Sequence, residues 1–361
     1  MNRATPGSLK APASPARVLT GFEPGDRILD FLRTDQTGKL QAFYEYSKGK
    51  SVVLAVVAKL PAKPNLLAIL QALSTQFSPV EDVCLLALMP QTVEANAALK
   101  AELNLQFPLW SDDGTVSTAL TQGSSQSAFR LLILDANLRI RSTFPNKKIK
   151  ASPESICSAV ETAITSLRFD QSPRHIQSQA PVLLVPDVLD ELLCKQLIKA
   201  HNQGKTFSSG MVRQVDGKRQ MMQEAETKRR VDHLVEDADI TKTVTDLLVR
   251  RLLPEMKKAF HFEPSNLEGL KIIRYDGQDQ GFFSPHRDNN TQEVARRRFA
   301  LTLNLNSPKT YKGGALRFLE YGPDLYHPAQ GEAWVFSCSH LHEVTPVTRG
   351  SRYVLITFFL R

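Results

Sequence analysis

Three continuous apolar runs in the first half of the chain constrain its fold most. They are Ser51 to Ala58, Val83 to Met89 and Leu131 to Asp135, each of strand length and without alternation of apolar and polar residues. Strands of this kind are covered on both faces, as in a sheet packed between helices. Helical stretches near residues 65–76 and 92–103 fill the intervals. The pattern from about residue 21 to residue 167 therefore predicts an α/β sandwich.

A helix with clear end signals closes this first region. Ser152 is suited to the N-cap and Pro153 to the first helical position. Ile156 and Val160 then begin one apolar stripe at helical spacing. The residues that follow, 169–180, are polar and lack periodicity, which is typical of a linker.

The second half has a different pattern. We expect a strand at 181–186 and then a helix that is capped by Asp187 and has Leu192 on its apolar stripe. A second helix from Asp239 must be kinked or interrupted by Pro254. From Leu270 onward, short β segments alternate with turn residues. The candidate strands are 271–276, 283–288, 299–306, 315–321, 334–344 and 352–360. Many short strands after two helices predict an α+β domain built on a double-stranded β-helix, or jelly roll.

Length and composition agree with two domains. A chain of 361 residues is long enough for two separate cores. We expect a disordered tail at 1–19, which lacks the apolar segment of a secretory signal. The predicted domains span residues 20–168 and 181–361, with the linker at 169–180 between them.

Charge and cysteine usage limit the partners and the compartment. The formal net charge is +8, but the cations are spread along the chain, so a nucleic-acid partner is not expected. The four cysteines lie far apart without a Cys-x-x-Cys pair, which fits a reducing compartment and indicates neither a zinc site nor a disulfide framework. The longest apolar runs fall far short of the ~20 residues of a membrane span. We expect a cytoplasmic protein without membrane contact.

One short motif in the second region offers metal ligands. His286 and Asp288 are separated by one residue, so on an extended backbone both side chains lie on one face. Two imidazoles and one carboxylate form the facial triad that binds non-haem Fe(II), and the third ligand must then come from a distant strand. For the pair alone, a His at a strand edge beside an Asp in a turn is the alternative interpretation.

The stretch 339–353 offers that third ligand. It contains His340 and His342, and Arg352 follows His342 by ten residues. Together with the His-x-Asp motif, these features make residues 181–361 resemble the Fe(II)- and 2-oxoglutarate-dependent dioxygenases, in particular the prolyl 4-hydroxylase-like branch.

The resemblance implies roles for individual residues. In that family a His-x-Asp pair and a distal His bind iron, and the matching residues here are His286, Asp288 and His342. A cation nine or ten residues past the distal His binds the far carboxylate of 2-oxoglutarate, for which a planar guanidinium is well suited. The residues that match the cosubstrate contacts are Arg352, Tyr275 and Asn304. Gly313 to Phe318 resembles the family's Gly-Gly-x-Leu-x-Phe segment.

Two alternatives stay open at the site. His340 is a rival ligand to His342, although the spacing to Arg352 and the His-Glu-Val-x-Pro context favour His342. Arg349 is a rival for the carboxylate, although its place in a turn before Gly350 favours Arg352.

The resemblance also implies a reaction. Oxidative decarboxylation of 2-oxoglutarate to succinate and carbon dioxide would accompany hydroxylation of a residue in a protein, such as proline, or of a free amino acid. Fe(II) is the expected cofactor, 2-oxoglutarate the cosubstrate and L-ascorbic acid a candidate reductant. The expected partner is a protein or peptide, and a homodimer is a candidate assembly.

A nucleic-acid demethylase with the same iron chemistry is an alternative function. The repair-type relatives follow the distal His with an Arg-x5-Arg pattern, however, and the spacing of Arg349, Arg352 and Arg361 does not reproduce it.

The first region resembles a peroxiredoxin of the thioredoxin fold. The segments that carry the resemblance are Gly25–Phe31, Asp35–Lys39, 51–58, Phe107–Asp112 and Leu134–Leu138. Peroxiredoxins place a peroxidatic cysteine at the start of the helix after the first core strand. The corresponding segment, 59–65, contains no cysteine. We therefore predict a redox-inactive module for docking or dimer contact, with a thiol peroxidase or redox adaptor as the alternative.

The second region also contains a long polar stretch between its two predicted helices. Residues 208–230 contain six Lys and Arg residues among Gln and Met, and by length and composition they predict a mobile loop. Such loops commonly act as substrate lids, so a lid is one interpretation and a solvated face or an unrelated insertion is the other.

Overall fold

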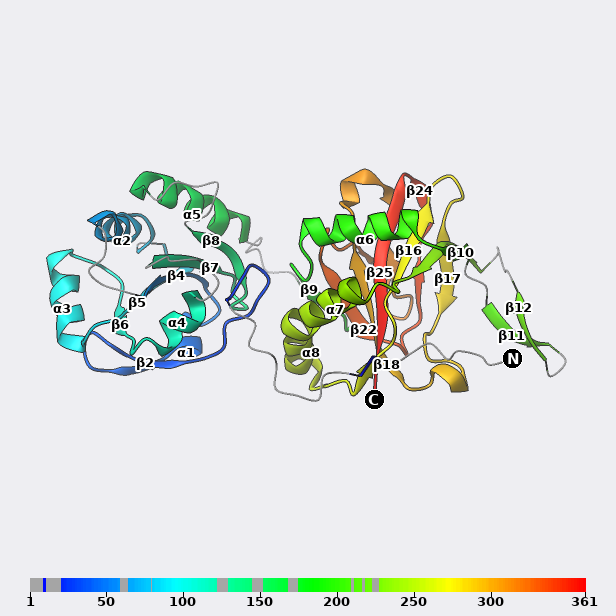
Figure 1. The fold of residues 1–361 in the computed structure, drawn as a ribbon, viewed down its shortest axis with the longest axis horizontal. Coiled ribbons are helices and arrows are strands. Elements are labelled where there is room, and N and C mark those ends of the chain that lie inside the picture. The colour runs from blue at the N-terminus through cyan, green and yellow to red at the C-terminus, as the bar shows by residue number, and fades with distance from the viewer. Residues whose placement is uncertain are drawn as a thin grey trace. The chain divides into compact units, whose positions relative to one another are not determined.

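The computed structural model of the chain consists of two compact units (Figure 1). The described residues are 9–10, 21–58, 64–78, 80–121, 129–144, 152–167, 175–208, 211–215, 218–222 and 227–361. The division falls inside the predicted linker, and Leu9–Lys10 pair with a strand of the C-terminal unit, whereas the rest of the predicted tail lies outside the described residues. The finer boundaries at 168 and 181 and the disorder of the tail stay predictions.

The N-terminal unit is built on a seven-stranded mixed sheet in the order β3-β2-β6-β5-β4-β7-β8. Strands β4, β5 and β6 are parallel neighbours, whereas β7 and β8 add antiparallel strands on one side and β2 and β3 on the other. The strands are β2 (Leu32–Asp35), β3 (Leu40–Ala42), β4 (Ser51–Val57), β5 (Val83–Met89), β6 (Leu109–Ser111), β7 (Phe129–Leu134) and β8 (Ile140–Phe144).

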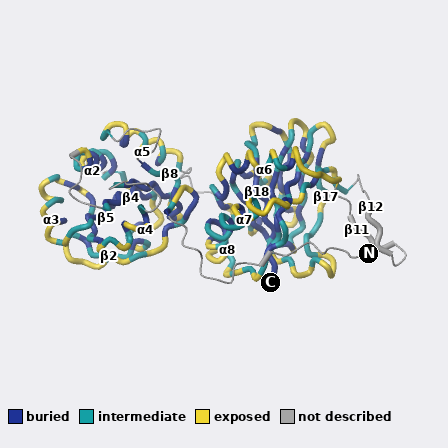
Figure 2. The backbone as a smooth tube through the Cα atoms, in the orientation of Figure 1, coloured by how far each residue is buried: buried dark blue, intermediate teal, exposed yellow. Residues whose placement is uncertain are grey.

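Helices cover both faces of this sheet. They are α1 (Phe43–Ser47), α2 (Pro64–Phe77), α3 (Val93–Glu102), α4 (Thr115–Thr121) and α5 (Pro153–Leu167). Successive side chains of β4 enter opposite cores: Val53 packs with the residues of α2 and α5, and Leu54 packs with Phe43 on the other face. The predicted α/β sandwich is confirmed, because the continuous apolar strands lie between two helical layers (Figure 2).

The predicted start of the last helix in this unit is also confirmed. The Ser155 amide donates to Oγ of Ser152 at 3.2 Å, and α5 begins at Pro153. Ile156 and Val160 are fully buried, as their stripe predicts.

The C-terminal unit contains a larger sheet whose main path is β10-β14-β16-β25-β18-β22-β9. Its strands are β9 (Leu183–Val185), β10 (Thr206–Ser208), β14 (Val231–Leu234), β16 (Lys271–Asp276), β18 (Arg297–Asn304), β22 (Ala333–Ser337) and β25 (Ser351–Leu360). The short strands β1 (Leu9–Lys10) and β15 (Asn266–Leu267) pair beside β25. The long central strand β25 contacts both β16 and β18 along most of its length.

A second sheet of five strands has the order β13-β17-β23-β20-β21. Its strands are β13 (Lys228–Arg229), β17 (Phe282–His286), β20 (Leu316–Arg317), β21 (Leu325–Tyr326) and β23 (His342–Val344), with β19 (Lys312–Gly313) and β24 (Val347–Arg349) forming a separate pair. Ile273 and Val354 of the larger sheet share one apolar core with Leu316 and Val344 of the smaller sheet. The two sheets therefore face each other across this core.

The outer face of the larger sheet is covered by helices. These are α6 (Glu191–Gln203), α7 (Ala238–Leu247), a π-helical segment (Leu248–Leu252) and α8 (Leu253–Phe260), with short 3-10 turns at Gln292–Val294 and Pro308–Thr310. Ile272 and Leu355 pack against these helices, whereas their chain neighbours Ile273 and Val354 face the core between the sheets. This alternation determines which side chains can reach a site between the sheets.

Two expectations for the helices need correction. Asp190, not Asp187, caps α6, because the Leu193 amide donates to Oδ1 of Asp190 at 2.8 Å, whereas Asp187 adopts a left-handed φ of +51° before the helix. Leu192, expected on the apolar stripe, is 68% exposed. The expected break at Pro254 is present as the π-helical segment that precedes α8, because proline lacks the amide hydrogen that an α-helix needs.

Each of the six predicted strand segments from residue 270 onward contains a strand, but the structure also has the short strands β19, β21 and β24, which the sequence did not predict. The segment 334–344 is two strands, β22 and β23, joined by a turn, and 315–321 shortens to Leu316–Arg317. The stretch 208–230 is not a plain loop. It contains the hairpin of β11 (Met211–Val215) and β12 (Lys218–Met222), while residues 209–210, 216–217 and 223–226 lie outside the described residues. The name jelly roll stays a prediction, since the described strands form separate sheets around a shared core.

Candidate metal centre

Two histidines lie opposite each other on neighbouring strands of the smaller sheet. His286 ends β17 and His342 begins β23, and the antiparallel pairing of these strands makes the two residues direct partners. Their ring centroids are 4.3 Å apart. Directly opposed side chains on one face of a sheet are the nearest cross-strand neighbours, so residues distant in sequence meet here.

Asp288 completes the group from the segment just after β17. Its Oδ1 lies 3.5 Å from Nε2 of His286, and its Oδ2 lies 3.5 Å from Nε2 of His342. The backbone amide of Asp288 donates to the Cys338 carbonyl at 2.9 Å, which fixes the segment against the turn before His342. Among the described residues, these three form a group able to hold a metal ion, with one donor atom from each within 4.8 Å of the others.

Hydrogen bonds set the tautomer of both imidazoles. Nδ1 of His286 lies 2.8 Å from the Ser284 carbonyl, and Nδ1 of His342 lies 2.9 Å from the His340 carbonyl. A carbonyl only accepts, so each Nδ1 carries the hydrogen and each Nε2 keeps its lone pair. The Nε2 atoms of both histidines therefore carry free lone pairs and lie next to the Asp288 carboxylate. All three groups are thus available as ligands for one metal ion.

The charge states suit a divalent metal. Burial acts to raise the pKa of Asp288, but its neighbours His286, His342 and Arg297 outweigh burial, so the pKa lies below its ordinary value. Burial lowers the pKa of His342, which favours the neutral imidazole. An ionised carboxylate beside neutral imidazoles is the ligand set that a divalent cation needs.

The rival histidine lies elsewhere. His340 is in the turn between β22 and β23, with Nδ1 3.3 Å from the Tyr321 hydroxyl. The group of three side chains contains His342 and not His340. His340 acts on the site through its backbone carbonyl, which accepts from His342.

Aromatic rings enclose the group. The Phe283 ring stacks on His286 with centroids 3.5 Å apart, and Phe336 and Phe318 lie against His342 at 4.7 and 6.0 Å. These rings exclude water from one side of the imidazoles and lower the local dielectric.

Arg230, beside these rings, was not expected from the sequence. Its guanidinium lies 4.8 Å from the centroid of the Phe283 ring, and its Nε lies 3.2 Å from Oδ1 of the buried Asp232. Burial opposes its charge, but Tyr275 and Asp232 outweigh this and raise the pKa of Arg230. No pattern in the sequence indicates these contacts, because Arg230 is one of several basic residues of a polar stretch.

The predicted carboxylate-binding arginine lies in the core between the sheets. Arg352 of β25 is 1% exposed, and its direct partner on β16 is Tyr275, whose ring centroid is 6.0 Å from the guanidinium carbon. Its Nε donates to Oδ1 of Asn304 at 3.1 Å, whereas its buried Nη2 has no hydrogen-bond partner. Among the described residues, no carboxylate lies within ion-pair distance of this guanidinium, and a buried guanidinium with an unsatisfied nitrogen is suited to an anionic ligand. Arg349, the rival, is exposed on β24.

Asn304 holds this arginine in place. Its Nδ2 donates to the Tyr311 hydroxyl at 2.9 Å and to the carbonyls of Asn306 and Pro328, which turns Oδ1 toward Arg352. Asn304 and Tyr275 thus adjoin Arg352 as expected, and their contacts with a cosubstrate stay predictions. Tyr311, which the sequence did not indicate, is a further buried polar group beside them.

A glycine makes room for the arginine. Gly314 has φ of +68°, and a Cβ atom there would lie 3.0 Å from Cδ of Arg352 and 2.7 Å from Cγ2 of Val347. A side chain at this position would therefore collide with the stem of Arg352.

The cysteines do not offer a reactive thiol. All four, Cys84, Cys157, Cys194 and Cys338, are buried and unpaired, and burial raises the pKa of each. The pKa of Cys84 rises to about 12, so its thiolate is scarce at neutral pH. The segment 59–65, where a peroxidatic cysteine would stand, lies mostly outside the described residues.

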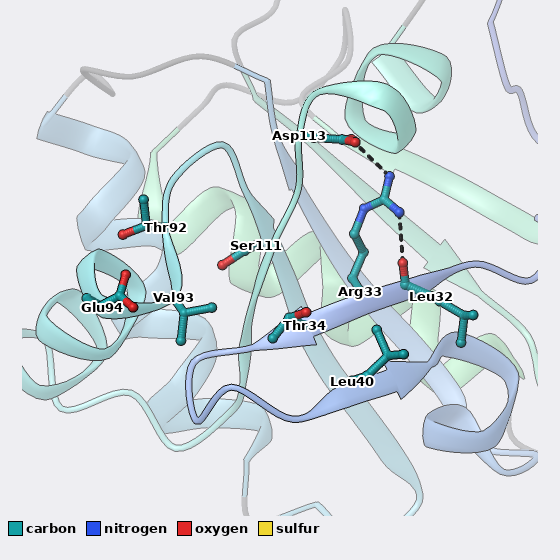
Figure 3. A pocket seen from close by; sticks show the side chains of 9 residues that line it. All are labelled: Leu32, Arg33, Thr34, Leu40, Thr92, Val93, Glu94, Ser111 and Asp113. Atoms are coloured by element: carbon teal, nitrogen blue, oxygen red, sulfur yellow. Dashed lines mark hydrogen bonds and ion pairs between the residues drawn. The ribbon is translucent and has the colours of Figure 1, made fainter.

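The N-terminal unit has a shallow pocket of about 490 Å³ beside the sheet edge (Figure 3). Its lining residues are Leu32, Arg33, Thr34, Leu40, Thr92, Val93, Glu94, Ser111 and Asp113. Arg33, its one cation, is already paired with Asp112 at 2.6 Å and Asp113 at 3.1 Å. The pocket therefore offers no unpaired cation to an anionic ligand. In the part of the chain that the structure describes, no helix is long and apolar enough to cross a bilayer.

Comparisons with known proteins agree with the site. Residues 270–360 match the model of the 2OG-Fe(II) oxygenase superfamily. A PKHD-type hydroxylase of Shewanella sp. (strain ANA-3) is 29% identical over 143 residues, which cover 38% of this chain and 63% of the relative. The rat multifunctional procollagen lysine hydroxylase and glycosyltransferase LH3 is 34% identical over 90 residues, covering 24% of this chain and 11% of the relative. The chain thus spans less than two thirds of these relatives.

Solved structures show similarity to each half. A Pseudomonas putida prolyl-4-hydroxylase aligns with a TM-score of 0.39 at 16% identity, covering 51% of this chain and 94% of that chain. The peroxidoxin BcpB from Mycobacterium tuberculosis aligns with a TM-score of 0.35 at 17% identity, covering 41% of this chain and 99% of that chain.

Proposed function

We propose that the C-terminal unit, whose residues 270–360 match the 2OG-Fe(II) oxygenase superfamily, is an Fe(II)- and 2-oxoglutarate-dependent oxygenase that hydroxylates a residue in a protein. The observation that carries this proposal is the convergence of His286, Asp288 and His342, with donor atoms within 4.8 Å of one another. Each of the three is an oriented donor, and the set is the facial triad of non-haem iron enzymes.

The donor set fits Fe(II). Two imidazole nitrogens and one carboxylate oxygen suit this ion and leave coordination positions open for other ligands. The backbone carbonyls at Nδ1 of His286 and His342 hold both rings in the ligating tautomer.

The neighbouring polar cluster fits 2-oxoglutarate. We assign the far carboxylate of the cosubstrate to the guanidinium of Arg352, whose Nη2 is buried without a hydrogen-bond partner. A carboxylate there would satisfy that nitrogen and pair the charge, which removes the cost of leaving a buried cation uncompensated. Tyr275 and Asn304 would then position the same end of the molecule.

The bound cofactors would supply the chemistry, in which dioxygen oxidises 2-oxoglutarate to succinate and carbon dioxide and one oxygen atom enters the substrate. The residues of the chain orient these reagents and keep the site dry. His286, Asp288 and His342 fix the metal position, Arg352 fixes the cosubstrate, and the ring of Phe283 shields one imidazole.

The names of the relatives support a protein substrate. The rat relative that is 34% identical to part of this chain is named as a procollagen lysine hydroxylase, that is, an enzyme that acts on a residue in a protein. We propose that the substrate is proline or another residue in a peptide, with a free amino acid as the alternative substrate. The proposed reductant is ascorbate. We place the activity in the cytoplasm and assign the hairpin of β11 and β12 to the substrate-facing lid.

The N-terminal unit has a different part in this proposal. The two thiols of this unit, Cys84 and Cys157, are buried and have raised pKa values, which supports a redox-inactive module over a thiol peroxidase. We propose that the unit serves docking or a dimer contact.

The experiment follows one oxygen atom. The full chain is incubated with Fe(II), 2-oxoglutarate, isotopically heavy dioxygen and a peptide library, and products are analysed by mass spectrometry. We expect a peptide that gains one heavy oxygen only when both Fe(II) and 2-oxoglutarate are present. Oxygen gain that is independent of 2-oxoglutarate would contradict the proposal.

A further inference from the structure

The residue between the two ligands of the His-x-Asp motif makes an unusual set of contacts. Nη2 of Arg287 lies 2.6 Å from Oε1 of Glu320, and its Nη1 lies 3.4 Å from Oε2. Nη1 of Arg287 also donates to the Ser339 carbonyl. Arg287 thus links the segment of His286 to the turn that precedes His342.

Glu320 reaches the same turn by a second route. Its Oε2 accepts a hydrogen bond from the Leu341 amide at 2.9 Å, and Leu341 is the residue directly before His342. One carboxylate therefore contacts both segments that carry the histidines. The hydrogen bond from Arg287 and then that from Leu341 lower the pKa of Glu320, so it is ionised at neutral pH.

The turn of residues 338–341 matters for the metal centre because of one atom. Nδ1 of His342 donates to the His340 carbonyl at 2.9 Å, and this hydrogen bond selects the tautomer with a free Nε2 lone pair. Two further bonds fix the turn to the other ligand segment, from the Asp288 amide to the Cys338 carbonyl at 2.9 Å and from Nδ2 of Asn289 to Oγ of Ser339 at 2.8 Å.

The exposure of the pair argues against a role in global stability. The side chains of Arg287 and Glu320 are 40% and 36% exposed, and exposed ion pairs contribute little to folding. Their contacts nevertheless join the segment that carries His286 to the turn that precedes His342.

We propose that Glu320, held by Arg287, is a positioning residue for the metal: it joins the two ligand-bearing segments and aligns the His340 carbonyl that orients His342. This inference rests on the proposed metal function of His286, Asp288 and His342. Loss of Glu320 would free the Leu341 amide and the turn while leaving all three ligands in the chain.

The test is a titration of the metal-free full chain with Co(II), followed by its visible absorption. Changes to partners of metal ligands typically weaken metal binding 10- to 100-fold, and we expect Glu320→Ala to fall in this range. Glu320→Gln keeps an oxygen that can accept from Leu341 but loses the charge, so we expect a smaller loss. The matched control is Glu191→Gln, which removes a surface ion pair with Lys195 of 2.6 Å on α6 and should leave Co(II) affinity unchanged.

Two further measurements separate the possible results. Thermal unfolding of the metal-free variants should match that of the wild type, which shows that the loss is local. Hydrogen exchange at the Leu341 amide should accelerate in Glu320→Ala and not in Glu191→Gln. Co(II) affinity of Glu320→Ala within twofold of the wild type would overturn this inference alone, whereas absence of Co(II) binding by the wild type would overturn the proposed function.

A charge reversal adds a sharper criterion. The double variant Arg287→Glu with Glu320→Arg restores the ion pair but places no acceptor at the Leu341 amide. We expect its Co(II) affinity to stay reduced by about 10-fold or more. Full recovery in the double variant would contradict the part that we assign to the Leu341 hydrogen bond.

Discussion

His286 and His342 face each other across the pairing of β17 and β23, with ring centroids 4.3 Å apart. Fifty-five intervening residues fold so that the two rings become direct neighbours, and Asp288 closes the group from the adjacent segment. Each ring is fixed by a backbone carbonyl at Nδ1. The candidate metal centre is therefore preorganised by strand pairing and by main-chain hydrogen bonds.

The first prediction distinguishes the two candidate histidines. In a Co(II) titration, His342→Ala should lose detectable high-affinity binding, because it removes one of three ligands. His340→Ala should retain binding, because its contribution is the backbone carbonyl that every residue supplies. Loss of Co(II) binding in His340→Ala together with full binding in His342→Ala would reverse the ligand assignment.

The second prediction concerns the cosubstrate arginine. Arg352→Met keeps the side-chain volume but removes the charge, and hydrogen bonds to charged groups contribute about 1.5–3 kcal/mol, so the KM for 2-oxoglutarate should rise roughly 10- to 150-fold. The matched control is Arg349→Met, which changes an exposed cation on β24 and should leave KM unaltered. A rise in KM for Arg349→Met but not for Arg352→Met would assign the carboxylate to the rival residue.

The third prediction concerns the thiols. Because all four cysteines are buried with raised pKa values, a thiol-reactive disulfide reagent should react slowly with the native chain and rapidly with four thiols after denaturation. Thiol-dependent peroxide consumption should be absent. A fast reaction of Cys84 or Cys157 in the native chain would reinstate the redox alternative for the N-terminal unit.

The fourth prediction is a pH dependence of stability. His201 is 1% exposed, and burial lowers its pKa below the ordinary value of about 6.5 despite hydrogen bonds of its ring with the Val231 carbonyl and Asn202. The nearby Arg274 and His233 act in the same direction as burial. The unfolded chain then binds the proton at a higher pH than the folded chain, so the unfolding free energy falls as pH drops below about 6.5.

Denaturant midpoints at pH 7.5 and 5.5 measure this dependence. His201→Gln, which lacks a titratable ring, should show a smaller decrease over this range than the wild type, whatever its absolute stability. Other histidines with lowered pKa values, His327, His340 and His342, keep the remaining decrease above zero. An equal or larger decrease in the variant would refute the assignment to His201.

The sequence predicted those features that depend on local pattern. Strand β16 occupies 271–276 as expected, because its alternating Ile273 and Tyr275 face the core while Ile272 faces the helices. The cap at Ser152 was equally local. The choice between Asp187 and Asp190 as the cap of α6 could not be made from the local sequence, since either aspartate can cap a helix. The left-handed φ of Asp187 follows from the surrounding structure.

Residues missed by the sequence share one property: their partners are distant. Arg230 contacts Phe283 because β13 pairs with β17, and Glu320 contacts Arg287 and Leu341 because three separate segments meet at one turn. No periodicity or spacing indicates such contacts. The His-x-Asp motif and the distal His were recognisable because the chemistry itself requires those residue types.

The most direct test of the central claim is succinate release from 2-oxoglutarate by the purified full chain, with and without Fe(II). We predict Fe(II)-dependent succinate formation by the wild type, its loss in His286→Ala and His342→Ala, and its retention in the control Glu191→Gln. Equal succinate formation by the wild type and the two histidine variants would contradict the account.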